Sequence, residues 1–243
     1  MAVQSPVTFK ILRFDPEKDK APYFASFQVT PKTGMSVLEG LFDILENQDG
    51  SLGLRFACRH AVCGSCAMAI NGCYRLACQT LIKDLNTDLI TVRPLGHLPV
   101  IKDLVVDMEP FYAKYEKIMP YLVGPNGKTD KELYQSIADR KKIDEQIDCI
   151  LCGCCYASCP VTLTDPDYLG PAALLKADRF YADSRDQVPK DRLKLVDGEH
   201  GVWRCHTVFN CYRACPKELN PTASIAHLKR GLLWRKLLGR IVR

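Results

Sequence analysis

The sequence has no long hydrophobic run. Nowhere in its 243 residues do apolar residues follow one another for the roughly 18 positions that a membrane-spanning helix needs. The N-terminal stretch MAVQSPVTFKILRF also lacks the apolar core of a secretion signal and the Arg- and Ser-rich pattern of an organelle-targeting peptide. We therefore expect a chain without a transmembrane segment that stays in the cytoplasm.

The usual signatures of nucleotide binding and of nucleophilic catalysis are absent as well. The sequence contains no G-x-G-x-x-G, the fingerprint of dinucleotide-binding folds, and no Walker A motif. It also has no pairing of nucleophile and base that indicates covalent catalysis. We expect any chemistry on an organic substrate to take place on another subunit.

Acidic residues are missing from the C-terminal end. No Asp or Glu follows Glu218, whereas this region carries the basic residues Lys229, Arg230, Arg235, Lys236, Arg240 and Arg243. The net charge of +5 is therefore a property of this end, which argues against a nucleic-acid-binding protein. The stretch IAHLKRGLLWRKLLGRIVR is either a last helix with a solvated face or a contact with anionic headgroups or an anchor subunit, and we favour the contact.

Cysteine is the residue type that the sequence has in excess. There are 13 cysteines in a composition that is otherwise ordinary for a globular protein, with 47% hydrophobic and 25% charged residues. Their number is odd, and many are separated by gaps of only two or three residues, which does not suit a disulfide framework. In a reducing compartment such spacing indicates bound metal.

The N-terminal part of the chain predicts a small α+β fold. Strands are expected, from alternating or short apolar runs, at residues 7–14, 23–30, 67–70 and 89–92. Asn71-Gly72 is a hairpin signal directly after one of these runs. Ser36 and Glu39 fit a capping box that opens an amphipathic helix.

The remainder of the chain predicts helices. Helical spacing of apolar residues is present at 109–122, 131–147 and 171–183. Asn220 and Pro221 fit an N-cap and a first-turn proline that start a last helix. We therefore predict two domains, residues 1–105 and residues 106–243, with the two late cysteine groups set between helices of the second.

The two late cysteine groups are copies of one pattern. The first is C-x2-C-x2-C-x3-C-P and consists of Cys149, Cys152, Cys155 and Cys159. The second has the same spacing and consists of Cys205, Val208, Cys211 and Cys215. This is the bacterial ferredoxin run, in which the fourth cysteine of each run ligates the cluster of the other run.

This crossing rule assigns the ligands of two clusters. A 4Fe–4S cluster takes Cys149, Cys152, Cys155 and Cys215. The other cluster takes Cys159, Cys205 and Cys211, and Val208 stands where its fourth ligand belongs. A cubane corner without a thiolate readily loses its iron, so we predict a 3Fe–4S cluster. Structural zinc is the alternative, but it does not require paired runs that end in Cys-Pro.

An earlier cysteine group has a different spacing. Its pattern is C-x4-C-x2-C-x11-C, from Cys58, Cys63, Cys66 and Cys78. The first part is the plant-type ferredoxin spacing of a 2Fe–2S cluster. The small residues around it, Ala57, Ala61, Gly64, Ser65 and Ala67, leave room for backbone N–H groups to approach the sulfurs.

Two cysteines remain outside these three groups. We interpret Cys73 and Cys154 as ordinary thiols outside the clusters, although a shift of register would let Cys154 replace Cys155 as a ligand. Three clusters of different type in one chain predict a path for single electrons.

Four groups of residues carry a resemblance to a known family: CRHAVCGSCAMAINGCYRLAC, DLVVDMEPFYAKYEKIMPYL, YLGPAAL with DSRD, and CHTVFNC with CPKELNP. They resemble the iron–sulfur subunit of succinate dehydrogenase and quinol:fumarate reductase (complex II), over about residues 7 to 230. The resemblance implies a β-grasp, plant-type ferredoxin-like domain followed by an all-helical, bacterial-ferredoxin-like domain, with family ligands at the eleven cysteines assigned above.

The resemblance also implies partners and an electron path. Electrons would pass between the FAD of a flavoprotein subunit and a quinone at a membrane anchor, in the order FAD, 2Fe–2S, 4Fe–4S, 3Fe–4S, quinone. Dicarboxylate chemistry would belong to the flavoprotein. The chain would then be a peripheral subunit at the cytoplasmic face of a bacterial or archaeal inner membrane.

The quinone end of the path is less defined by the sequence. By position in the family pattern, Pro160, His206 and Lys229 are the candidate quinone-binding residues. His206 is either a proton-relaying or quinone-binding residue or a solvated or core histidine, and Lys229 is alternatively one charge of a basic helix face. After the first Cys-Pro the chain has VTLTDP without tryptophan, closer to fumarate reductases, whereas CHTVFNC is closer to succinate dehydrogenases. The direction of electron flow therefore stays open.

The other histidines carry weaker signals. His60 lies between two predicted ligands, where its charge would tune the 2Fe–2S potential, and His97 and His200 lie outside any motif.

Two alternative functions remain. The iron–sulfur subunit of another flavoprotein system, glycolate-oxidase-like or heterodisulfide-reductase-like, is the alternative within the same class. A colourless zinc or nucleic-acid-binding module is the alternative from another class.

Overall fold

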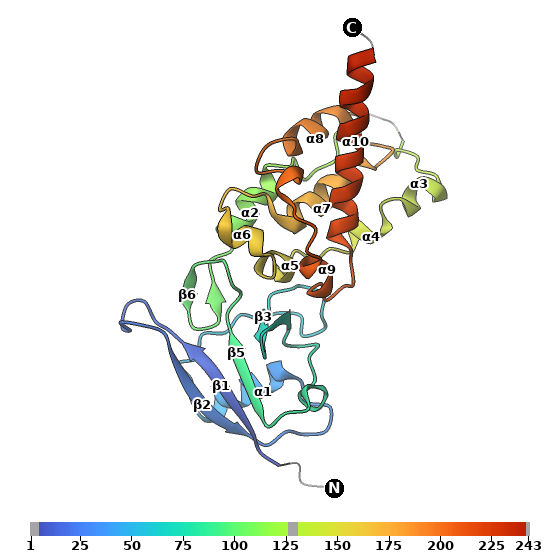
Figure 1. Cartoon of the computed structure of the whole chain (residues 1–243). Coiled ribbons are helices and arrows are strands. Elements are labelled where there is room, and N and C mark those ends of the chain that lie inside the picture. Colours follow the sequence, from blue (N-terminus) through green and yellow to red (C-terminus); the bar gives the residue numbers. More distant parts are fainter. Residues whose placement is uncertain (1–4, 126–130, 242–243) are drawn as a thin grey trace. The chain divides into compact units, whose positions relative to one another are not determined.

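The computed structural model describes residues 5–125 and 131–241, with side chains described as far as Leu237 (Figure 1). The chain divides into two compact units. The first consists of Met1–Met108 together with Ile150–Ala157, and the second of Glu109–Cys149 together with Ser158–Arg243. No helix among the described residues is both long enough and apolar enough to cross a bilayer.

The first unit is built on a mixed five-stranded sheet with the order β2-β1-β5-β3-β4. The strands are β1 Val7–Arg13, β2 Tyr23–Val29, β3 Ala67–Ile70, β4 Cys73–Leu76 and β5 Leu89–Arg93. β1 pairs antiparallel with β2 and parallel with β5, and β3 pairs antiparallel with both β4 and β5. All four predicted strands are confirmed, and β4 forms the second arm of the predicted hairpin.

The hydrophobic pattern of the first unit explains its layers. Along β1 every second residue is buried, and Phe9 and Ile11 are completely inaccessible to solvent. Helix α1 (Val37–Asn47) covers this face, and Ser36 and Glu39 form the predicted capping box. Gly40 permits the close packing, since a Cβ there would lie 2.5 Å from Cζ of Phe9.

Three short elements complete the sheet unit, and the sequence did not indicate them. They are the 3₁₀ helix η1 (Ile82–Leu85) and the two-stranded hairpin of β6 (Val100–Lys102) and β7 (Val105–Val106). Arg13 at the end of β1 donates to Asp103 between β6 and β7, at 2.9 Å, and pairs with Asp49. This buried network joins the hairpin to the sheet.

The segment 150–157 lies far along the chain but belongs to the first unit. It contains the short helix α5 (Cys154–Ala157), which packs against β4. The predicted boundary between residues 105 and 106 treats everything after it as one block. In the structure this cysteine-bearing segment packs with the sheet unit, and the division into domains 1–105 and 106–243 stays a prediction.

All regular elements among the described residues of the second unit are helices. Its elements are α2 Glu109–Glu116, α3 Ile137–Lys141, α4 Asp144–Ile147, α6 Pro160–Thr164, α7 Gly170–Tyr181, α8 Pro189–Val196, η2 Val202–Arg204, α9 Asn210–Arg213 and α10 Pro221–Ile241. The core lies around α7, where Leu174 is fully buried together with Leu228 and Leu232 of α10.

Predicted helices were right in place but partly wrong in length. The helices expected at 171–183 and after Asn220 are confirmed, and Oδ1 of Asn220 accepts from the backbone N–H of Ala223 at 3.0 Å. The expected helix at 109–122 ends at Glu116, four residues before Pro120. The expected helix at 131–147 is two short helices, and the first starts only at Ile137, where Ser136 acts as an N-cap and accepts from the N–H of Asp139.

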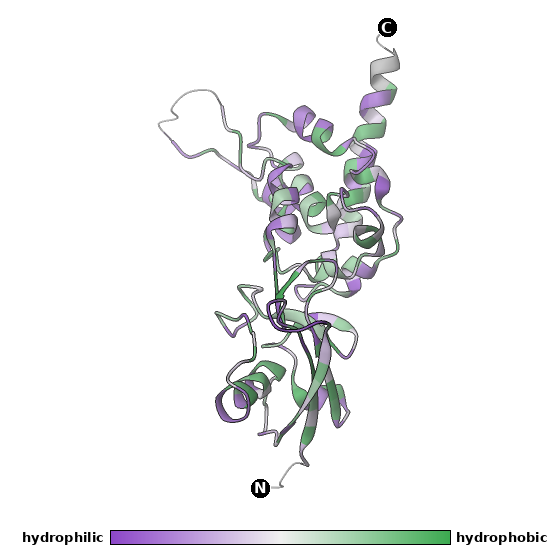
Figure 2. Ribbon diagram, turned by 90° about the vertical axis from the view of Figure 1, so that its left-hand side faces the viewer, coloured by the Kyte–Doolittle hydropathy of each residue, from purple (hydrophilic) through white to green (hydrophobic). Residues whose placement is uncertain are grey.

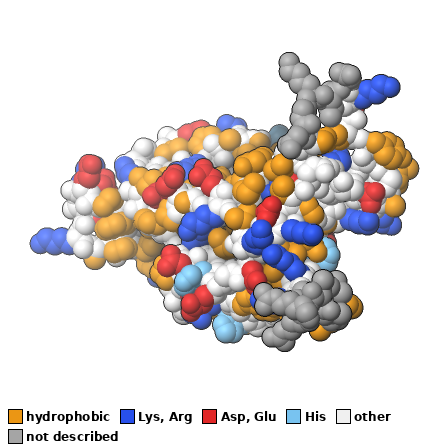
Figure 3. Space-filling model, turned by 90° about the horizontal axis from the view of Figure 1, so that it is seen from above, with side chains coloured by type: hydrophobic (Ala, Val, Ile, Leu, Met, Phe, Trp, Pro, Cys, Tyr) orange, Lys and Arg blue, Asp and Glu red, His pale blue; other side chains and the backbone are white. Residues whose placement is uncertain are grey.

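The outer part of α10 differs from its inner part. Leu228 and Leu232 are buried, whereas Leu233, Trp234 and Leu237 are 56%, 63% and 53% exposed. Hydrophobic and hydrophilic residues alternate along this part (Figure 2), and the view from the α10 end shows Lys and Arg side chains beside hydrophobic ones (Figure 3). The side chains of Arg240 and Arg243, which were included in the predicted basic end, lie outside the described residues.

Candidate iron–sulfur sites

The loop that carries Cys58, Cys63 and Cys66 points backbone N–H groups at sulfur atoms. Sγ of Cys58 accepts from the N–H groups of His60, Val62 and Cys63, each at 3.3 Å. Sγ of Cys78 accepts from the N–H of Ala61 at 3.3 Å. Converging N–H groups stabilise negative charge on thiolates, so the loop fits an anionic 2Fe–2S cluster.

Unusual backbone angles produce this arrangement. Arg59, Ala61 and Gly64 have φ angles of 60°, 55° and 75°, in the left-handed region. The sequence-based expectation that small residues admit the N–H groups holds for Ala61, but His60 and Val62 donate equally well. The left-handed φ angles of Arg59, Ala61 and Gly64 shape the loop so that these N–H groups face the sulfurs, and residue size does not indicate such angles.

An aromatic pair holds the loop against α1. The rings of Phe42 and Phe56 meet edge to face with centroids 4.6 Å apart. The guanidinium carbon of Arg59 lies 5.0 Å from the Phe42 ring centroid and 5.7 Å from that of Phe56. These cation–π contacts position the start of the loop on a rigid helix.

The thiols of this group differ in their acidity. Burial raises the pKa of Cys66 to about 12. Burial also acts on Cys63, but hydrogen bonds from Ser65 and Cys58 outweigh it and lower the pKa of Cys63 to about 6. Cluster ligands are thiolates, so a cluster held here would displace a proton from Cys66, whereas Cys63 would lose its proton more readily.

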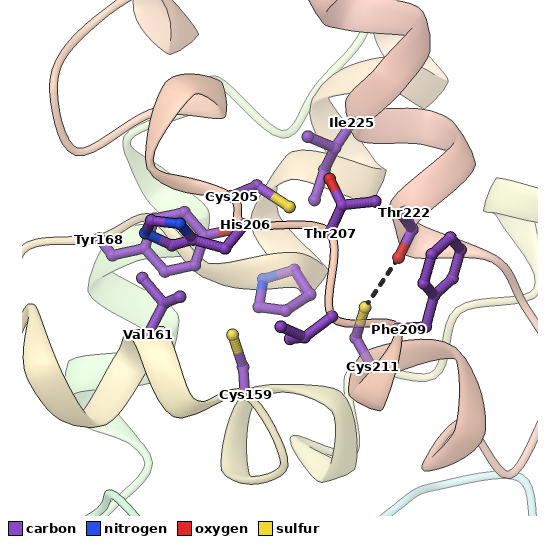
Figure 4. Close-up of a pocket in the computed structure, with 12 residues that line it drawn as sticks. Cys159, Val161, Tyr168, Cys205, His206, Thr207, Phe209, Cys211, Thr222 and Ile225 are labelled. Atoms are coloured by element: carbon purple, nitrogen blue, oxygen red, sulfur yellow. Dashed lines mark hydrogen bonds between the residues drawn. The ribbon is translucent and has the colours of Figure 1, made fainter.

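A pocket in the second unit brings together the residues predicted for the three-iron cluster. Cys159, Cys205 and Cys211 line it (Figure 4), and Val208 also belongs to the lining. The pocket is partly open to solvent. The three sulfur donors and the apolar side chain at the fourth position fit a cluster that lacks one iron.

Three short helical elements position these cysteines. Cys159 directly precedes α6, Cys205 directly follows η2, and Cys211 lies in α9. Thr207 and Phe209 on either side of Val208 have φ angles of 59° and 61°. The segment between two of the cysteines is therefore a loop wrapped around the pocket rather than a helix.

Two hydroxyl groups reach sulfur atoms in this pocket, and sequence spacing did not indicate either. Oγ1 of Thr222, at the start of α10, lies 3.3 Å from Sγ of Cys211. The hydroxyl of Tyr168, which is 1% exposed, is hydrogen-bonded to the Cys205 thiol. Burial raises the pKa of Tyr168, so this hydroxyl keeps its proton and acts as a donor.

The three candidate quinone-binding residues lie in different surroundings. His206 lines the pocket and is exposed, and Pro160 is exposed at the first position of α6. Lys229 extends from α10, and its Nζ donates to the backbone carbonyl of Cys205 at 3.1 Å. Lys229 therefore has a defined partner beside the pocket, and its role at the quinone end stays a prediction.

The residues predicted for the 4Fe–4S cluster are distributed over both units. Cys152 and Cys155 belong to the first unit, and Cys149 and Cys215 belong to the second. Cys149 follows α4, whose last carbonyls are capped by Lys176. The Nζ of Lys176 donates to Gln146 at 3.0 Å and to Ile147 at 3.3 Å.

The remaining cysteines and histidines also have defined places. Cys154 is fully buried within α5, and Cys73 is exposed at the start of β4. The His97 ring donates to the backbone carbonyl of Tyr156, and Nδ1 of His200 lies 2.9 Å from a carboxylate oxygen of Asp165. Both histidines have a structural partner, which agrees with their place outside the motifs.

Comparison with known proteins decides the family. The 2Fe-2S iron-sulfur cluster binding domain matches residues 8–113, and the 4Fe-4S dicluster domain matches residues 145–219. The chain is 45% identical over 230 residues to the succinate dehydrogenase iron-sulfur subunit of Coxiella burnetii, covering 93% of this chain and 97% of that protein. The chain belongs to the family of succinate dehydrogenase iron–sulfur subunits.

Further succinate dehydrogenase relatives agree in sequence and in fold. The chain is 44% identical over 229 residues to the mitochondrial succinate dehydrogenase (ubiquinone) iron-sulfur subunit of Candida glabrata, covering 93% of this chain and 90% of that protein. A chain of the Mycobacterium smegmatis Sdh1 complex in the apo form has a TM-score of 0.89 at 26% identity, covering 97% and 98% of the two chains. A hypothetical protein from Helicobacter pylori shares the fold alone, with a TM-score of 0.58 at 18% identity over 94% of this chain and 40% of that one.

Membership of the succinate dehydrogenase family confirms the main predictions. The chain is the electron-transferring iron–sulfur component of an oxidoreductase complex, and its fold is the predicted α+β arrangement of a 2Fe–2S domain followed by a helical cluster domain. The matches do not favour the alternative assignment to another flavoprotein or heterodisulfide-reductase-like system.

Proposed function

We propose that this chain connects the FAD of a flavoprotein subunit to a quinone at a membrane anchor in a succinate:quinone or quinol:fumarate oxidoreductase. When bound, its 2Fe–2S, 4Fe–4S and 3Fe–4S clusters supply one-electron steps in that order from the flavin side. Dicarboxylate chemistry stays on the flavoprotein. The grouping of three cysteines and Val208 around one pocket is the observation that carries the proposal.

The proposed ligands follow the spacing of the sequence. The 2Fe–2S cluster is held by Cys58, Cys63, Cys66 and Cys78, the 4Fe–4S cluster by Cys149, Cys152, Cys155 and Cys215, and the 3Fe–4S cluster by Cys159, Cys205 and Cys211. Support comes from the N–H groups aimed at Cys58 and Cys78 and from the common pocket of the last three. Cys73 and Cys154 are not ligands in this proposal.

Residues near the three-iron pocket serve the quinone end. His206 offers an exposed imidazole at the pocket, where it can hydrogen-bond a quinone oxygen or relay a proton. Lys229 places a cation against the carbonyl of the proposed ligand Cys205 and favours added negative charge there. Pro160 fixes the backbone directly after Cys159.

The outer part of α10 is the proposed contact with the membrane anchor. It combines exposed Leu233, Trp234 and Leu237 with the basic side chains of Arg235 and Lys236. Apolar and basic residues on one helix suit an interface beside anionic headgroups. We place the chain as a peripheral subunit at the cytoplasmic face of a bacterial or archaeal inner membrane.

Selective loss of the first cluster tests the proposed electron path. In the purified complex, Cys63→Ala removes a proposed 2Fe–2S ligand, so succinate should no longer reduce the 4Fe–4S and 3Fe–4S clusters. Dithionite, which does not need the flavin, should still reduce both. Cys73→Ala is the matched control at an exposed cysteine and should behave as the wild type. Normal reduction by succinate in Cys63→Ala would contradict the proposed order.

A further inference from the structure

Two cysteine-bearing loops of the first unit approach each other closely at Gly64. Its φ is +75°, and a Cβ at this position would lie 2.8 Å from Cβ and 2.9 Å from Cα of Cys152. The backbone nitrogen of Cys152 would be 3.3 Å away. Backbone atoms cannot move aside as the end of a flexible side chain can, so only glycine fits here.

The rest of the segment 150–157 is held by the same unit. A Cβ at Gly153 would lie 3.3 Å from Cδ1 of Leu95, so the segment packs against the turn after β5. Two residues further along that turn, the His97 ring donates to the backbone carbonyl of Tyr156. The segment is therefore fixed at its start by Gly64 and at its end by His97.

This arrangement has a consequence for electron transfer. The 2Fe–2S loop and the loop with Cys152 and Cys155 belong to one compact unit, and no side chain separates them at Gly64. Electron tunnelling between two centres falls steeply with their separation. A displacement of one loop by the width of a methyl group therefore slows transfer without touching a ligand.

We propose that Gly64 is a positioning residue that sets the separation between the 2Fe–2S cluster and the cluster held by Cys152 and Cys155. The proposal rests on the proposed ligand assignment. It goes beyond that assignment because Gly64 acts by its missing side chain and ligates nothing. The segment 150–157 is in this view a part of the 2Fe–2S unit that carries two ligands of the next cluster.

The chain offers a matched control for backbone strain. Gly72 in the β3–β4 turn has a φ of +78°, and no heavy atom lies within 4 Å of the position that its Cβ would take. Gly64→Ala and Gly72→Ala therefore impose the same left-handed backbone on alanine. Only Gly64→Ala introduces a collision with Cys152.

Two readouts in the purified complex compare these variants. With both clusters reduced, their magnetic interaction shortens the spin relaxation of the 2Fe–2S signal, and Gly64→Ala should lose part of this enhancement. Hydrogen exchange of residues 150–157 should rise in Gly64→Ala and stay at the wild-type level in Gly72→Ala. Equal relaxation and equal exchange in the two variants would overturn the proposal.

A second variant covers the case in which Gly64→Ala fails to assemble. His97→Asn keeps a residue that tolerates the φ of +64° but cannot reach the carbonyl of Tyr156. It should raise exchange in 150–157 and weaken the relaxation enhancement, and wild-type values for both would count against the proposal. Iron, sulfide and the cluster signals of the wild type test the proposed function separately, because the exchange comparison of Gly64 and Gly72 does not require them.

Discussion

Two hydroxyl groups lie beside sulfur atoms in the pocket lined by Cys159, Cys205 and Cys211. Oγ1 of Thr222 lies 3.3 Å from Sγ of Cys211, and both residues are buried. A hydrogen bond to a ligand sulfur stabilises the more negative, reduced cluster and so raises its midpoint potential. Tyr168 contributes a second such bond, at Cys205.

Thr222→Val should lower the midpoint potential of the proposed three-iron cluster. Valine keeps the shape of threonine but removes the donor. A hydrogen bond contributes about 0.5–1.5 kcal/mol, which corresponds to roughly 20–60 mV for one electron. Redox titration of the oxidised 3Fe–4S EPR signal measures the shift. Thr222→Ser keeps the hydroxyl and should stay near the wild type, so equal potentials in both variants would refute the role of this bond.

Only some residues of this pocket could be predicted from the sequence. The spacing of the cysteines predicts that Cys159, Cys205 and Cys211 form one site together with Val208. In the structure all four residues line one pocket. Thr222 and Tyr168 were not predicted, because they come from other elements and ordinary threonines and tyrosines carry no spacing signal. Only the packing of α10 and of the turn before α7 places them at sulfur atoms.

Helices α7 and α10 are joined by a histidine–aspartate pair. Nδ1 of His227 lies 2.6 Å from Oδ1 of Asp178, which is fully buried and also accepts from Gln146 at 3.1 Å. The hydrogen bond with Asp178 raises the pKa of His227, against opposing effects of burial and of Arg230. The ring of Tyr181 lies beside the imidazole, 5.4 Å between centroids.

This pair should make the stability of the helical unit depend on pH. Because the folded-state pKa is raised, the stabilisation is fully present below the unfolded value of about 6.5 and is lost as pH rises through the folded-state value. The imidazole is 43% exposed, so screening keeps the effect below about 1 kcal/mol. Thermal unfolding of the complex, measured from about pH 6, below the unfolded-state pKa, up to about pH 9, tests this pH dependence.

His227→Gln isolates the contribution of the pair. The variant keeps a hydrogen-bonding group toward Asp178 but does not titrate, so its melting temperature should depend less on pH than that of the wild type. The pKa of His200 is also raised by its partner Asp165, so part of the dependence should persist. An unchanged pH dependence in His227→Gln would show that the pair does not contribute.

At the level of elements, the sequence predicted strands better than helix ends. Alternation along β1 and the Asn71-Gly72 turn are local signals, and the structure confirms both. The stretch 131–147 has helical spacing of apolar residues, yet Ile137 is 91% exposed and the helix is interrupted. A periodic pattern forms a long helix only when another element covers its apolar face.

The whole molecule is organised differently from the order of its sequence. A boundary drawn between residues 105 and 106 follows the change from strands to helices, but the segment 150–157 returns to the first unit. No local pattern indicates this return, since it depends on contacts with Leu95, His97 and Gly64 that are distant in sequence. The cysteine spacing predicts which residues act together, and tertiary packing decides which unit holds them.

EPR spectroscopy of the complex with Val208→Cys tests the central claim most directly. Val208 is 47% exposed, lines the pocket with the three cysteines and occupies the position predicted for the fourth ligand. The oxidised wild-type complex should show a 3Fe–4S signal. Val208→Cys should lose that signal, gain one iron atom per chain and carry a second 4Fe–4S cluster of lower potential. A wild type without the oxidised 3Fe–4S signal, or a variant that keeps it with unchanged iron content, would contradict the account.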